Sequence, residues 1–406
     1  QTPNPKPQTP NPTGLLRPLV NNVILIMENY SSIKEGVVLR PTESEFKDFR
    51  TYVENIVNSK EYANIGAVKI VMPVSFNKER CALKSDIEKI MVANPIQQHV
   101  CKGNNLYQLN LVTKKSMNIK DYKALVEKQA KAFPSITKEN VRDIEKFLWS
   151  HLHLSSPLYG ADVKKSLFKT PGSSSWNLNN LNSVLSDILG KRSLPGINVP
   201  YIYIGGFGTM FAWHVEDFNL ASVNYLHLGS PKLWYTISPT QYKLFEKWVK
   251  LHHPEGFVNC SQFLRHKTTL VNPYLLKAEI PELIIEKHVQ REGEMMLVFG
   301  SSYHSGFNLG FNIAEAVNFA TDSWLTEFIK FRACTCQSKN FFIDPMFVLN
   351  ELKRKKGVVS TALLKEFEDQ IERKFSKKLP PAVNKSQKKV HSRLKNKISK
   401  KIGKEK

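Results

Sequence analysis

Cysteine is scarce in this chain, with five residues among 406: Cys81, Cys101, Cys260, Cys334 and Cys336. A small secreted protein that depends on disulfides carries many cysteines, in an even number and behind a signal peptide. This chain has few cysteines, an odd number of them, and no visible signal peptide. The cysteine content therefore argues against a secreted disulfide scaffold and favours reduced thiols in the cytosol or the nucleus.

Long apolar stretches are also missing. No run approaches the roughly 18 apolar residues that a membrane-spanning helix needs, so we expect no membrane partner. No secretory signal peptide is visible either. The chain begins at Gln1 rather than at a methionine, so the missing signal carries little weight.

Acidic residues are outnumbered, with 36 of them against 58 lysines and arginines, which gives a formal net charge of +22. The last segment, residues 374–406, holds 13 basic residues and one acidic residue, a net charge of +12. With no aromatic residue after Phe375, we expect this tail to stay disordered. It is either a solubilising tail or a segment for nuclear import and for contact with the phosphates of nucleosomal DNA.

One histidine and one carboxylate, His214 and Glu216, stand two residues apart, and a second histidine, His304, follows much later. Two histidines and one carboxylate form the facial ligand set of non-haem Fe(II) oxygenases. The pattern alone is weak, because the chain has 11 histidines and a lone histidine in an apolar strand is usually structural. Alternate residues of a strand point to the same side, so His214 and Glu216 can share one face.

Hydrophobic periodicity predicts strands and helices around these residues. Strand-forming runs cover 66–73, 199–204, 221–228 and 294–299, and strands alternate with turns throughout 199–322. Thr42 and Glu45 have the spacing of a helix-capping box, followed by an apolar helical face from Phe46 to Val57. Further helices are predicted from Thr137, over 176–189, and after Phe341.

A second group of metal-binding residue types is formed by Cys260, His266, Cys334 and Cys336. Three cysteines and one histidine form a common structural zinc site, although the spacings here are not those of a zinc finger. The open alternative is that these are buried free thiols. Cys81 and Cys101 have no such pattern around them.

Several motifs resemble the JmjC domain of the jumonji histone demethylases: residues 211–217, 224–227, 231–235 and 304–308. Residues 38–46 look like the JmjN segment, and residues 94–98 and 158–162 look like the region that joins JmjN to JmjC. The closest resemblance is to the lysine demethylase 4 subfamily, and the motifs occur in the same order.

The resemblance implies an α+β fold, in which a double-stranded β-helix (a jelly-roll, cupin-like JmjC barrel) carries flanking helices and a JmjN segment. It divides the chain into a disordered leader and lead-in (1–35), JmjN (36–78), a mixed connecting region (79–165), the JmjC catalytic barrel with its zinc site (166–336), C-terminal helices (337–373) and the basic tail (374–406).

The resemblance also implies Fe(II) on His214, Glu216 and His304, zinc on the cysteine and histidine group, and 2-oxoglutarate as cosubstrate. The cosubstrate positions of the family fall on Tyr159, Asn224, Lys232 and Trp234. The pattern alone favours a solvated strand lysine at Lys232, and the alternatives for Tyr159 and Trp234 are a turn aromatic and a core residue. A cosubstrate carboxylate would offset the cost of burying a lysine.

A methyl-lysine pocket is implied at Gly196, Tyr203, Glu216, Ala316, Val317 and Asn318, and Asp162 matches a residue that contacts the histone backbone. Ala316 and Val317 depart from the Ser-Thr pair that is frequent in the family, which makes that wall more apolar. The function implied is that of a nuclear histone lysine demethylase, which removes methyl groups from di- or trimethylated histone H3, at lysine nine, lysine thirty-six or both, and releases formaldehyde. The alternatives are a protein hydroxylase with a non-histone substrate, or a chromatin-binding module with weak or no catalysis.

Overall fold

The computed structural model describes residues 33–79, 84–103, 105–133, 137, 140–154, 156–168, 174–334, 336 and 343–376. Residues 1–32 of the predicted leader and lead-in, Cys81 and nearly all of the predicted basic tail lie outside these residues. The end of the predicted lead-in is ordered, because Lys34–Glu35 form a strand. The chain divides into two compact units, Gln1–Ile343 and Asp344–Lys406. Within the described residues, no helix combines the length and the apolar character that crossing a bilayer requires.

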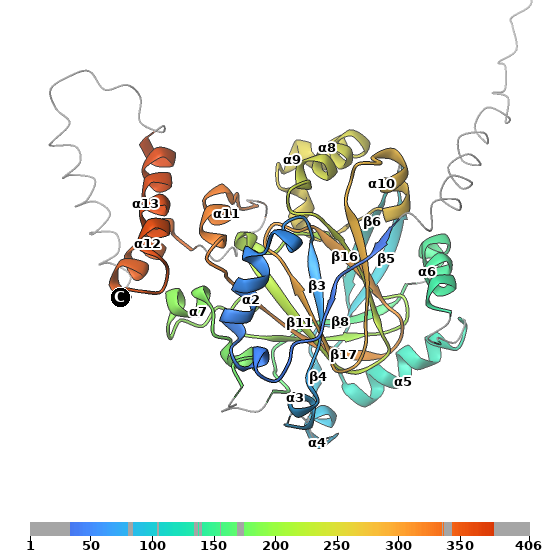
Figure 1. Cartoon of the computed structure of the whole chain (residues 1–406). Coiled ribbons are helices and arrows are strands. Elements are labelled where there is room, and N and C mark those ends of the chain that lie inside the picture. The colour runs from blue at the N-terminus through green and yellow to red at the C-terminus, as the bar shows by residue number, and fades with distance from the viewer. Residues whose placement is uncertain are drawn as a thin grey trace, which may run out of the picture. The chain divides into compact units, whose positions relative to one another are not determined.

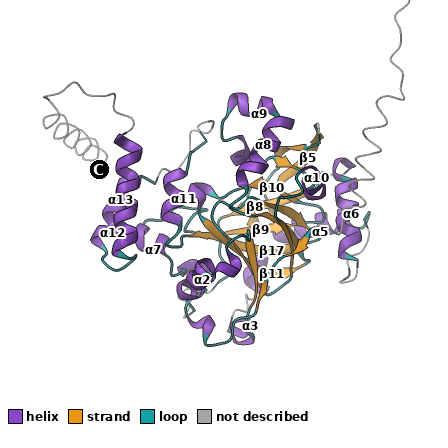
Figure 2. Cartoon of the chain, turned by 45° about the horizontal axis from the view of Figure 1, so that its top comes forward, coloured by secondary structure: helices purple, strands orange, loops and turns teal. Residues whose placement is uncertain are grey.

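The first unit is built on two large sheets, and its strands gather in the middle with helices outside them (Figure 1, Figure 2). The smaller sheet has five strands, in the order β1 (Lys34–Glu35), β14 (Ile285–Gln290), β12 (Lys232–Ile237), β16 (His304–Asn308) and β10 (Met210–His214). Together with the larger sheet it gives the predicted α+β double-stranded β-helix, in which two sheets take the place of one closed barrel.

The larger sheet has ten strands. Their order is β13 (Thr269–Leu270), β6 (Tyr107–Thr113), β5 (Ile96–Lys102), β8 (Leu158–Val163), β9 (Tyr201–Gly205), β17 (Asn312–Phe319), β11 (Ala221–Gly229), β15 (Glu294–Val298), β3 (Ala67–Val71) and β2 (Val38–Leu39). A separate pair joins β4 (Met91–Val92) to β7 (Met117–Asn118). The strands predicted at 66–73, 199–204, 221–228 and 294–299 are confirmed as β3, β9, β11 and β15.

Helices surround the sheets of the first unit. They are α2 (Phe49–Asn58), α3 (Val74–Glu79), α4 (Lys84–Glu88), α5 (Ile119–Ala130), α6 (Val141–Ser150), α7 (Val184–Leu189), α8 (Tyr242–His252), α9 (Pro254–Asn259), α10 (Pro273–Glu279) and α11 (Trp324–Lys330). The second unit contributes α12 (Pro345–Arg354) and α13 (Thr361–Ser376), which an ion pair between Lys353 and Glu368 joins. These two helices confirm the helical pattern predicted after Phe341.

The beginning of α2 differs from the prediction. Thr42 and Glu45 do form the reciprocal hydrogen bonds of a capping box, but these close only a short 3-10 turn, Glu45–Lys47. The helix itself begins at Phe49, where the Asp48 carboxylate accepts a hydrogen bond from the Thr51 amide. Asp48 therefore takes over the N-cap role that the sequence assigned to Thr42.

Two other predicted helices are shorter than expected. The helix predicted from Thr137 begins at Val141, because Thr137 and Asn140 bond each other in a preceding turn. The helix predicted over 176–189 is confirmed only as α7, from Val184. Asn177 closes a separate turn by accepting a hydrogen bond from the Asn179 amide. Short polar side chains bond their neighbouring backbone in this way and compete with the helix.

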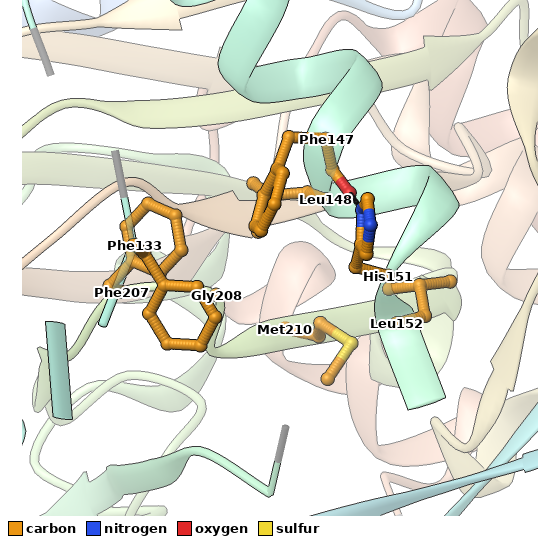
Figure 3. Close-up of a pocket in the computed structure, with 8 residues that line it drawn as sticks. All are labelled: Phe133, Phe147, Leu148, His151, Leu152, Phe207, Gly208 and Met210. Carbon is orange, nitrogen blue, oxygen red and sulfur yellow. Dashed lines mark hydrogen bonds between the residues drawn. The ribbon is translucent and has the colours of Figure 1, made fainter. Parts of the chain in front are cut away.

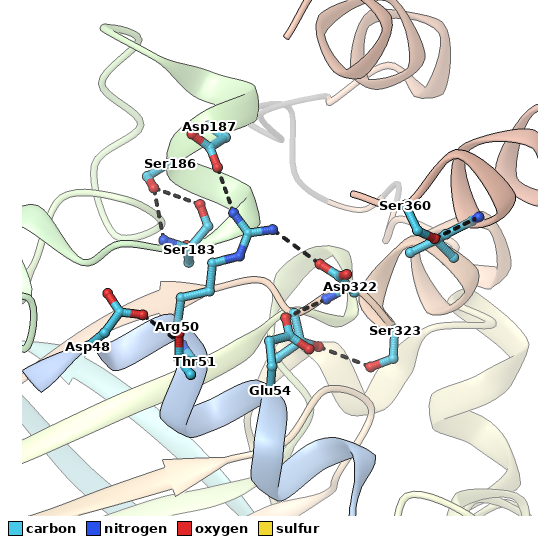
Figure 4. A network of polar contacts seen from close by, with 12 residues as sticks. Asp48, Arg50, Thr51, Glu54, Ser183, Ser186, Asp187, Asp322, Ser323 and Ser360 are labelled. Carbon is cyan, nitrogen blue, oxygen red and sulfur yellow. Dashed lines mark hydrogen bonds and ion pairs between the residues drawn. The ribbon is translucent and has the colours of Figure 1, made fainter. Parts of the chain in front are cut away.

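Arg50 fastens α2 to the rest of the first unit (Figure 4). Its guanidinium lies 2.9 Å from the Asp187 carboxylate in α7 and 3.2 Å from that of Asp322, which follows β17. The Glu54 carboxylate accepts a hydrogen bond from the Asp322 amide in the same network. The N-terminal segment thus supplies strands to both large sheets and a helix that is tied to the end of β17.

Candidate iron and cosubstrate site

A cavity of about 570 Å³ lies in the first unit, and residues from both large sheets line it. All the residues that the sequence proposed for iron, cosubstrate and methyl-lysine line this one cavity: Tyr159, Asp162, Gly196, Tyr203, His214, Glu216, Asn224, Lys232, Trp234, His304, Ala316, Val317 and Asn318. Residues from distant parts of the chain therefore converge on one space, as a binding site requires.

The ligand atoms of His214, Glu216 and His304 lie within 4.8 Å of one another. Cross-strand pairing explains part of this, because His214 in β10 pairs directly with His304 in β16, and their rings are 4.1 Å apart. The prediction that His214 and Glu216 share one strand is wrong in one detail, since β10 ends at His214. Glu216 keeps an extended backbone beyond the strand end, with φ −66° and ψ 155°. Its carboxylate consequently reaches the two imidazoles.

A backbone carbonyl oxygen on the side away from Nε2 orients each of the two imidazoles. The Nδ1 atom of His214 lies 2.7 Å from the Ala212 carbonyl oxygen, and that of His304 lies 3.1 Å from the Ser302 carbonyl oxygen. Each Nδ1 can donate its proton there, so that Nε2 carries a free lone pair. The Nε2 atom of His304 lies 3.5 Å from the Glu216 carboxylate. Burial, followed by His304, lowers the pKa of His214 well below its usual value, which favours the neutral form that binds metals.

These features fit a divalent metal ion. Two neutral imidazole nitrogens and one carboxylate face the same point, and the set leaves the remaining coordination positions to other ligands. Burial would raise the pKa of Glu216, but the hydrogen bond with His304 and the nearby Lys267 hold it well below its usual value. The carboxylate is therefore ionised and ready to bind a cation.

Lys232 lies in β12, which pairs with β16, the strand that carries His304. Lys232 is four residues along the ladder from the position opposite His304. Lys232 pairs with Asn308 and Thr236 pairs with His304, which places the two positions about 13 Å apart at the Cα level. Gly306 lies between His304 and Asn308, and a side chain there would overlap the Phe211 ring and the Leu233 carbonyl. Because Gly306 has no side chain, the Phe211 ring can pack against it in the cavity wall.

The Lys232 ammonium is almost completely buried, with 1% of the residue exposed. It donates a hydrogen bond of 2.5 Å to Asn308, but no carboxylate of the described residues forms an ion pair with it. Burial lowers its pKa to about 7. A buried ammonium without a counter-ion is costly, and an anion bound beside it would stabilise the protonated, charged form of Lys232.

Two further groups are ready to bind that anion. The side-chain oxygen of Asn224 is buried and has no hydrogen-bond partner in the described part of the chain. Its amide can turn to present either the oxygen or the NH₂ group. Burial, and then the charge of Asp162, raise the pKa of Tyr159 above its usual value, so the phenol keeps its proton and can donate it. A dicarboxylate such as 2-oxoglutarate fits this group of donors.

Aromatic side chains line the wall between Lys232 and the iron ligands. The ring centres of Phe211 and Trp234 are 4.6 Å apart, and those of Trp234 and His304 are 6.2 Å apart with 29° between the ring planes. The Lys232 ammonium lies 5.4 Å above the Phe211 ring. Hydrogen bonding of the Trp234 indole to Gln290 fixes the position of this wall.

Sequence reasoning missed several residues of the cavity. Phe211 lines the cavity, and Asn308 accepts the hydrogen bond of the Lys232 ammonium. Both were within the motifs that carry the resemblance but received no role. Lys267 follows His266 directly and has a left-handed backbone, with φ 58°. Burial lowers its pKa, but the carboxylates of Glu216, Asp217 and Asp162 outweigh this effect and raise it. A lone lysine after a histidine carries no signal that would have placed it beside the iron ligands.

The cysteine and histidine group also converges. Ligand atoms of Cys260, His266, Cys334 and Cys336 lie within 4.8 Å of one another. The Cys260 and Cys334 sulfurs are 3.5 Å apart, and the His266 Nε2 atom is 3.2 Å from the Cys334 sulfur. Sulfurs bound tetrahedrally to one zinc ion would be separated by roughly 3.8 Å, given a Zn–S bond of about 2.3 Å. The spacing and the ligand types fit zinc.

A second void, under α6, is lined by Phe133, Phe147, Leu148, His151, Leu152, Phe207, Gly208 and Met210 (Figure 3). Its volume is about 10 Å³, which is at the lower limit for a single water molecule. His151 directs its Nδ1 atom to the Phe147 carbonyl oxygen instead of into the void. A space of this size is too small for a cosubstrate or for a methylated lysine side chain.

Comparison with known proteins agrees with the geometry. Residues 201–319 match the family "JmjC domain, hydroxylase", and residues 37–72 match "jmjN domain". The chain is 37% identical over 305 residues to mouse lysine-specific demethylase 4B, covering 74% of this chain and 27% of that protein. It is 36% identical over 300 residues to human probable lysine-specific demethylase 4F, covering 73% and 46%, and 36% identical over 306 residues to rat lysine-specific demethylase 4D, covering 74% and 58%.

The chain thus spans between 27% and 58% of the length of these relatives. The matched domains contain both segments that line the iron end of the cavity, β10 and β16, and the N-terminal strands that extend the larger sheet. The chain contains a JmjN and a JmjC domain, and over about three quarters of its length it is similar to the lysine-specific demethylase 4 proteins.

Proposed function

We propose that the chain is a histone lysine demethylase that depends on Fe(II) and 2-oxoglutarate. The observation that carries the proposal is the pairing, in one cavity, of a three-residue metal site with a buried ammonium that lacks a carboxylate partner among the described residues. In the proposed assignment His214, Glu216 and His304 hold iron, while Lys232, Tyr159 and Asn224 hold the distal carboxylate of 2-oxoglutarate. Trp234 and Phe211 cover the cosubstrate.

Bound iron would supply the oxidation of an N-methyl C–H bond by O₂, coupled to the oxidation of 2-oxoglutarate. One oxygen atom enters succinate as CO₂ leaves, and the other converts the N-methyl group to N-hydroxymethyl. The C–N bond then breaks, so that formaldehyde and the less methylated amine are released. The protein's part is to orient the substrates and to exclude water.

The substrate we propose is di- or trimethyl-lysine of histone H3, at lysine nine, lysine thirty-six or both. Its pocket would be formed by Gly196, Tyr203, Glu216, Ala316, Val317 and Asn318, and Asp162 would contact the histone backbone. All seven residues line the cavity. The positively charged methylammonium would lie among phenol, amide and carboxylate oxygens. The three relatives are named as lysine-specific demethylases, which supports this substrate class and a nuclear location.

The test is to incubate the purified chain with Fe(II), 2-oxoglutarate and H3 peptides that differ only in methylation. We expect methylated peptides to stimulate succinate production, and the unmethylated peptide to leave it at the basal rate. Equal succinate production with all peptides would argue for a different substrate, as in the alternative of a non-histone hydroxylase. No succinate at all would favour the chromatin-binding alternative.

Replacing Tyr159 by phenylalanine should weaken 2-oxoglutarate binding. A phenol hydrogen bond to a carboxylate is worth roughly 1.5–3 kcal/mol, so the KM for 2-oxoglutarate should rise about tenfold to a hundredfold. The kcat should change little, because this contact is the same in the ground state and the transition state. Steady-state kinetics at saturating peptide measures both. An unchanged KM would show that Tyr159 is not the donor.

Ala316 is expected to set the preference for methylation state. Ala316 in β17 pairs with Asn224 in the neighbouring strand β11. Val317 belongs to the apolar cluster that packs against α2. A dimethylammonium keeps one N–H, which is costly to bury without an acceptor, and a trimethylammonium has none. We therefore expect a preference for trimethyl-lysine.

Ala316→Ser should raise kcat/KM for the dimethyl peptide a fewfold relative to the trimethyl peptide, since each CH···O contact contributes only about 0.5–1 kcal/mol. Val317→Thr is the matched control and should shift this ratio less. A wild-type chain that processes the dimethyl peptide faster would contradict the argument.

Nucleosomal DNA is the second partner we propose, through the basic segment 374–406. Its 13 basic residues would neutralise phosphates and release counterions. The slope of log affinity against log salt concentration should therefore be about −0.9 for each phosphate contact. Deleting 377–406 should weaken nucleosome binding at low salt and leave turnover of short peptides nearly unchanged. Equal nucleosome affinity with and without the segment would rule out this role.

A further inference from the structure

Arg265 joins the two candidate metal sites. Its Nη1 donates to the carbonyl oxygen of the iron-site residue Glu216 at 3.1 Å, and its Nη2 donates to the Asn219 side-chain oxygen at 2.6 Å. Its Nε donates to Gln262 at 3.3 Å, and its guanidinium carbon lies 4.7 Å from the centre of the Phe331 ring. The Arg265 side chain thus makes two hydrogen bonds to the loop that begins at Glu216.

The loop held by Arg265 has a backbone that needs outside support. Phe218 and Asn219 both adopt left-handed conformations, with φ 56° and φ 54°, which a phenylalanine rarely does. From α11, the Trp324 indole donates to the Phe218 carbonyl oxygen. The Asn219 amide donates to the Glu327 carbonyl oxygen in the same helix. The Asn219 backbone N–H donates to the Glu216 carbonyl oxygen at 3.1 Å. Arg265 donates to the same oxygen, and its side chain ties Glu216 to the 3-10 turn Phe263–His266.

The segments that position Arg265 are those that carry the cysteine and histidine group. Arg265 lies in the 3-10 turn Phe263–His266, directly before His266. Phe331, on which its guanidinium rests, lies three residues before Cys334. A metal ion that binds His266 and Cys334 would hold these two segments together, and would thereby fix the guanidinium between them.

We propose that Arg265 is a positioning residue for Glu216, and that metal bound to Cys260, His266, Cys334 and Cys336 acts on the iron site through it. This inference rests on the proposed function, because it requires that His214, Glu216 and His304 bind a metal ion. Lysine cannot replace Arg265 here, since it lacks the planar fork that reaches the Glu216 carbonyl and Asn219 together.

The direct test is the affinity of the zinc-loaded chain for Mn(II), measured by electron paramagnetic resonance of the free ion. Mn(II) prefers oxygen and imidazole ligands and does not displace zinc from thiolates. We expect Arg265→Ala to bind Mn(II) roughly tenfold to a hundredfold more weakly than the wild type, the range found when a group that supports a metal ligand is lost. Arg265→Lys should also bind more weakly.

Arg50→Ala is the matched control. It removes a partly buried arginine whose two ion pairs are with Asp187 and Asp322, neither of which is a proposed metal ligand, so we expect it to lower stability and to leave the Mn(II) affinity unchanged. All measurements are made well below the unfolding temperature of each variant, with the zinc content determined. Arg265→Ala and Arg265→Lys that both bind Mn(II) as tightly as the wild type would overturn the proposal.

If Arg265→Ala does not fold, Asn219→Gly tests the same contact. Glycine tolerates the left-handed backbone at this position but offers no acceptor to Arg265. It should weaken Mn(II) binding a fewfold, and an unchanged affinity would count against the proposal. Mn(II) binding that survives His214→Ala unchanged would instead overturn the proposed function, and this inference with it.

The coupling between the two sites is tested by a double-mutant cycle. Cys336→Ser should weaken Mn(II) binding in the wild-type background, and should weaken it no further once Arg265 is replaced by lysine. Fully additive losses would show that the cysteine and histidine group does not act through Arg265.

Discussion

His214→Ala should abolish 2-oxoglutarate turnover and lower the affinity for Fe(II) by more than about a hundredfold, beyond the range seen for groups that only support a ligand. The reason is geometric. The imidazole of His214 is one of three groups whose ligand atoms converge within 4.8 Å. The measurement is anaerobic Fe(II) binding together with succinate production.

The fold should survive the His214→Ala substitution. The backbone pairing of β10 with β16 does not depend on the imidazole, and the side chain faces the cavity. His151→Ala is the matched control, because His151 is stacked on Phe147 and lies outside the cavity. Normal iron binding and turnover in the His214 variant would refute the assignment of the iron site.

The second large effect is expected for Cys336→Ser. Structural zinc contributes its binding free energy to folding, so losing one ligand should remove several kcal/mol of stability. At about 2–4 °C per kcal/mol, Tm should fall by roughly 10 °C. Metal analysis and thermal unfolding of the purified variant give the two quantities, and the zinc content should fall as well.

Cys101→Ser is the control for that measurement, because Cys101 is an exposed thiol of β5 outside the cluster. It should keep both its zinc and its Tm. A freshly purified wild-type chain without zinc would contradict the assignment of the cluster.

The sequence was informative wherever a local pattern determines structure. Alternating strand formers predicted β3, β9, β11 and β15. The ends of elements were less predictable, because side chains compete for backbone groups there. Asp48 displaced Thr42 as the cap of α2 for this reason. Similarly, the spacing of His214 and Glu216 was correct, but it could not show that β10 ends between them.

The candidate site was predictable to the extent that motifs marked its residues. The three iron positions and Lys232 are in or beside such motifs. The contacts of Arg265 with Glu216 and Asn219 span more than 45 residues of sequence, and no spacing rule connects them. Lys267 was missed for the same reason, since it follows the 3-10 turn Phe263–His266, far in sequence from Glu216. Phe211 lies within the motif of His214, but the motif did not show that its ring would face Lys232.

Formaldehyde release from a trimethylated H3 peptide is the most direct test of the central claim, with Fe(II), O₂ and 2-oxoglutarate supplied. A demethylase releases one formaldehyde for each peptide-dependent succinate, and the peptide loses the mass of one methylene group. Peptide-dependent succinate without formaldehyde, and with a peptide that gains one oxygen atom, would contradict the proposed demethylation and identify the chain as a hydroxylase.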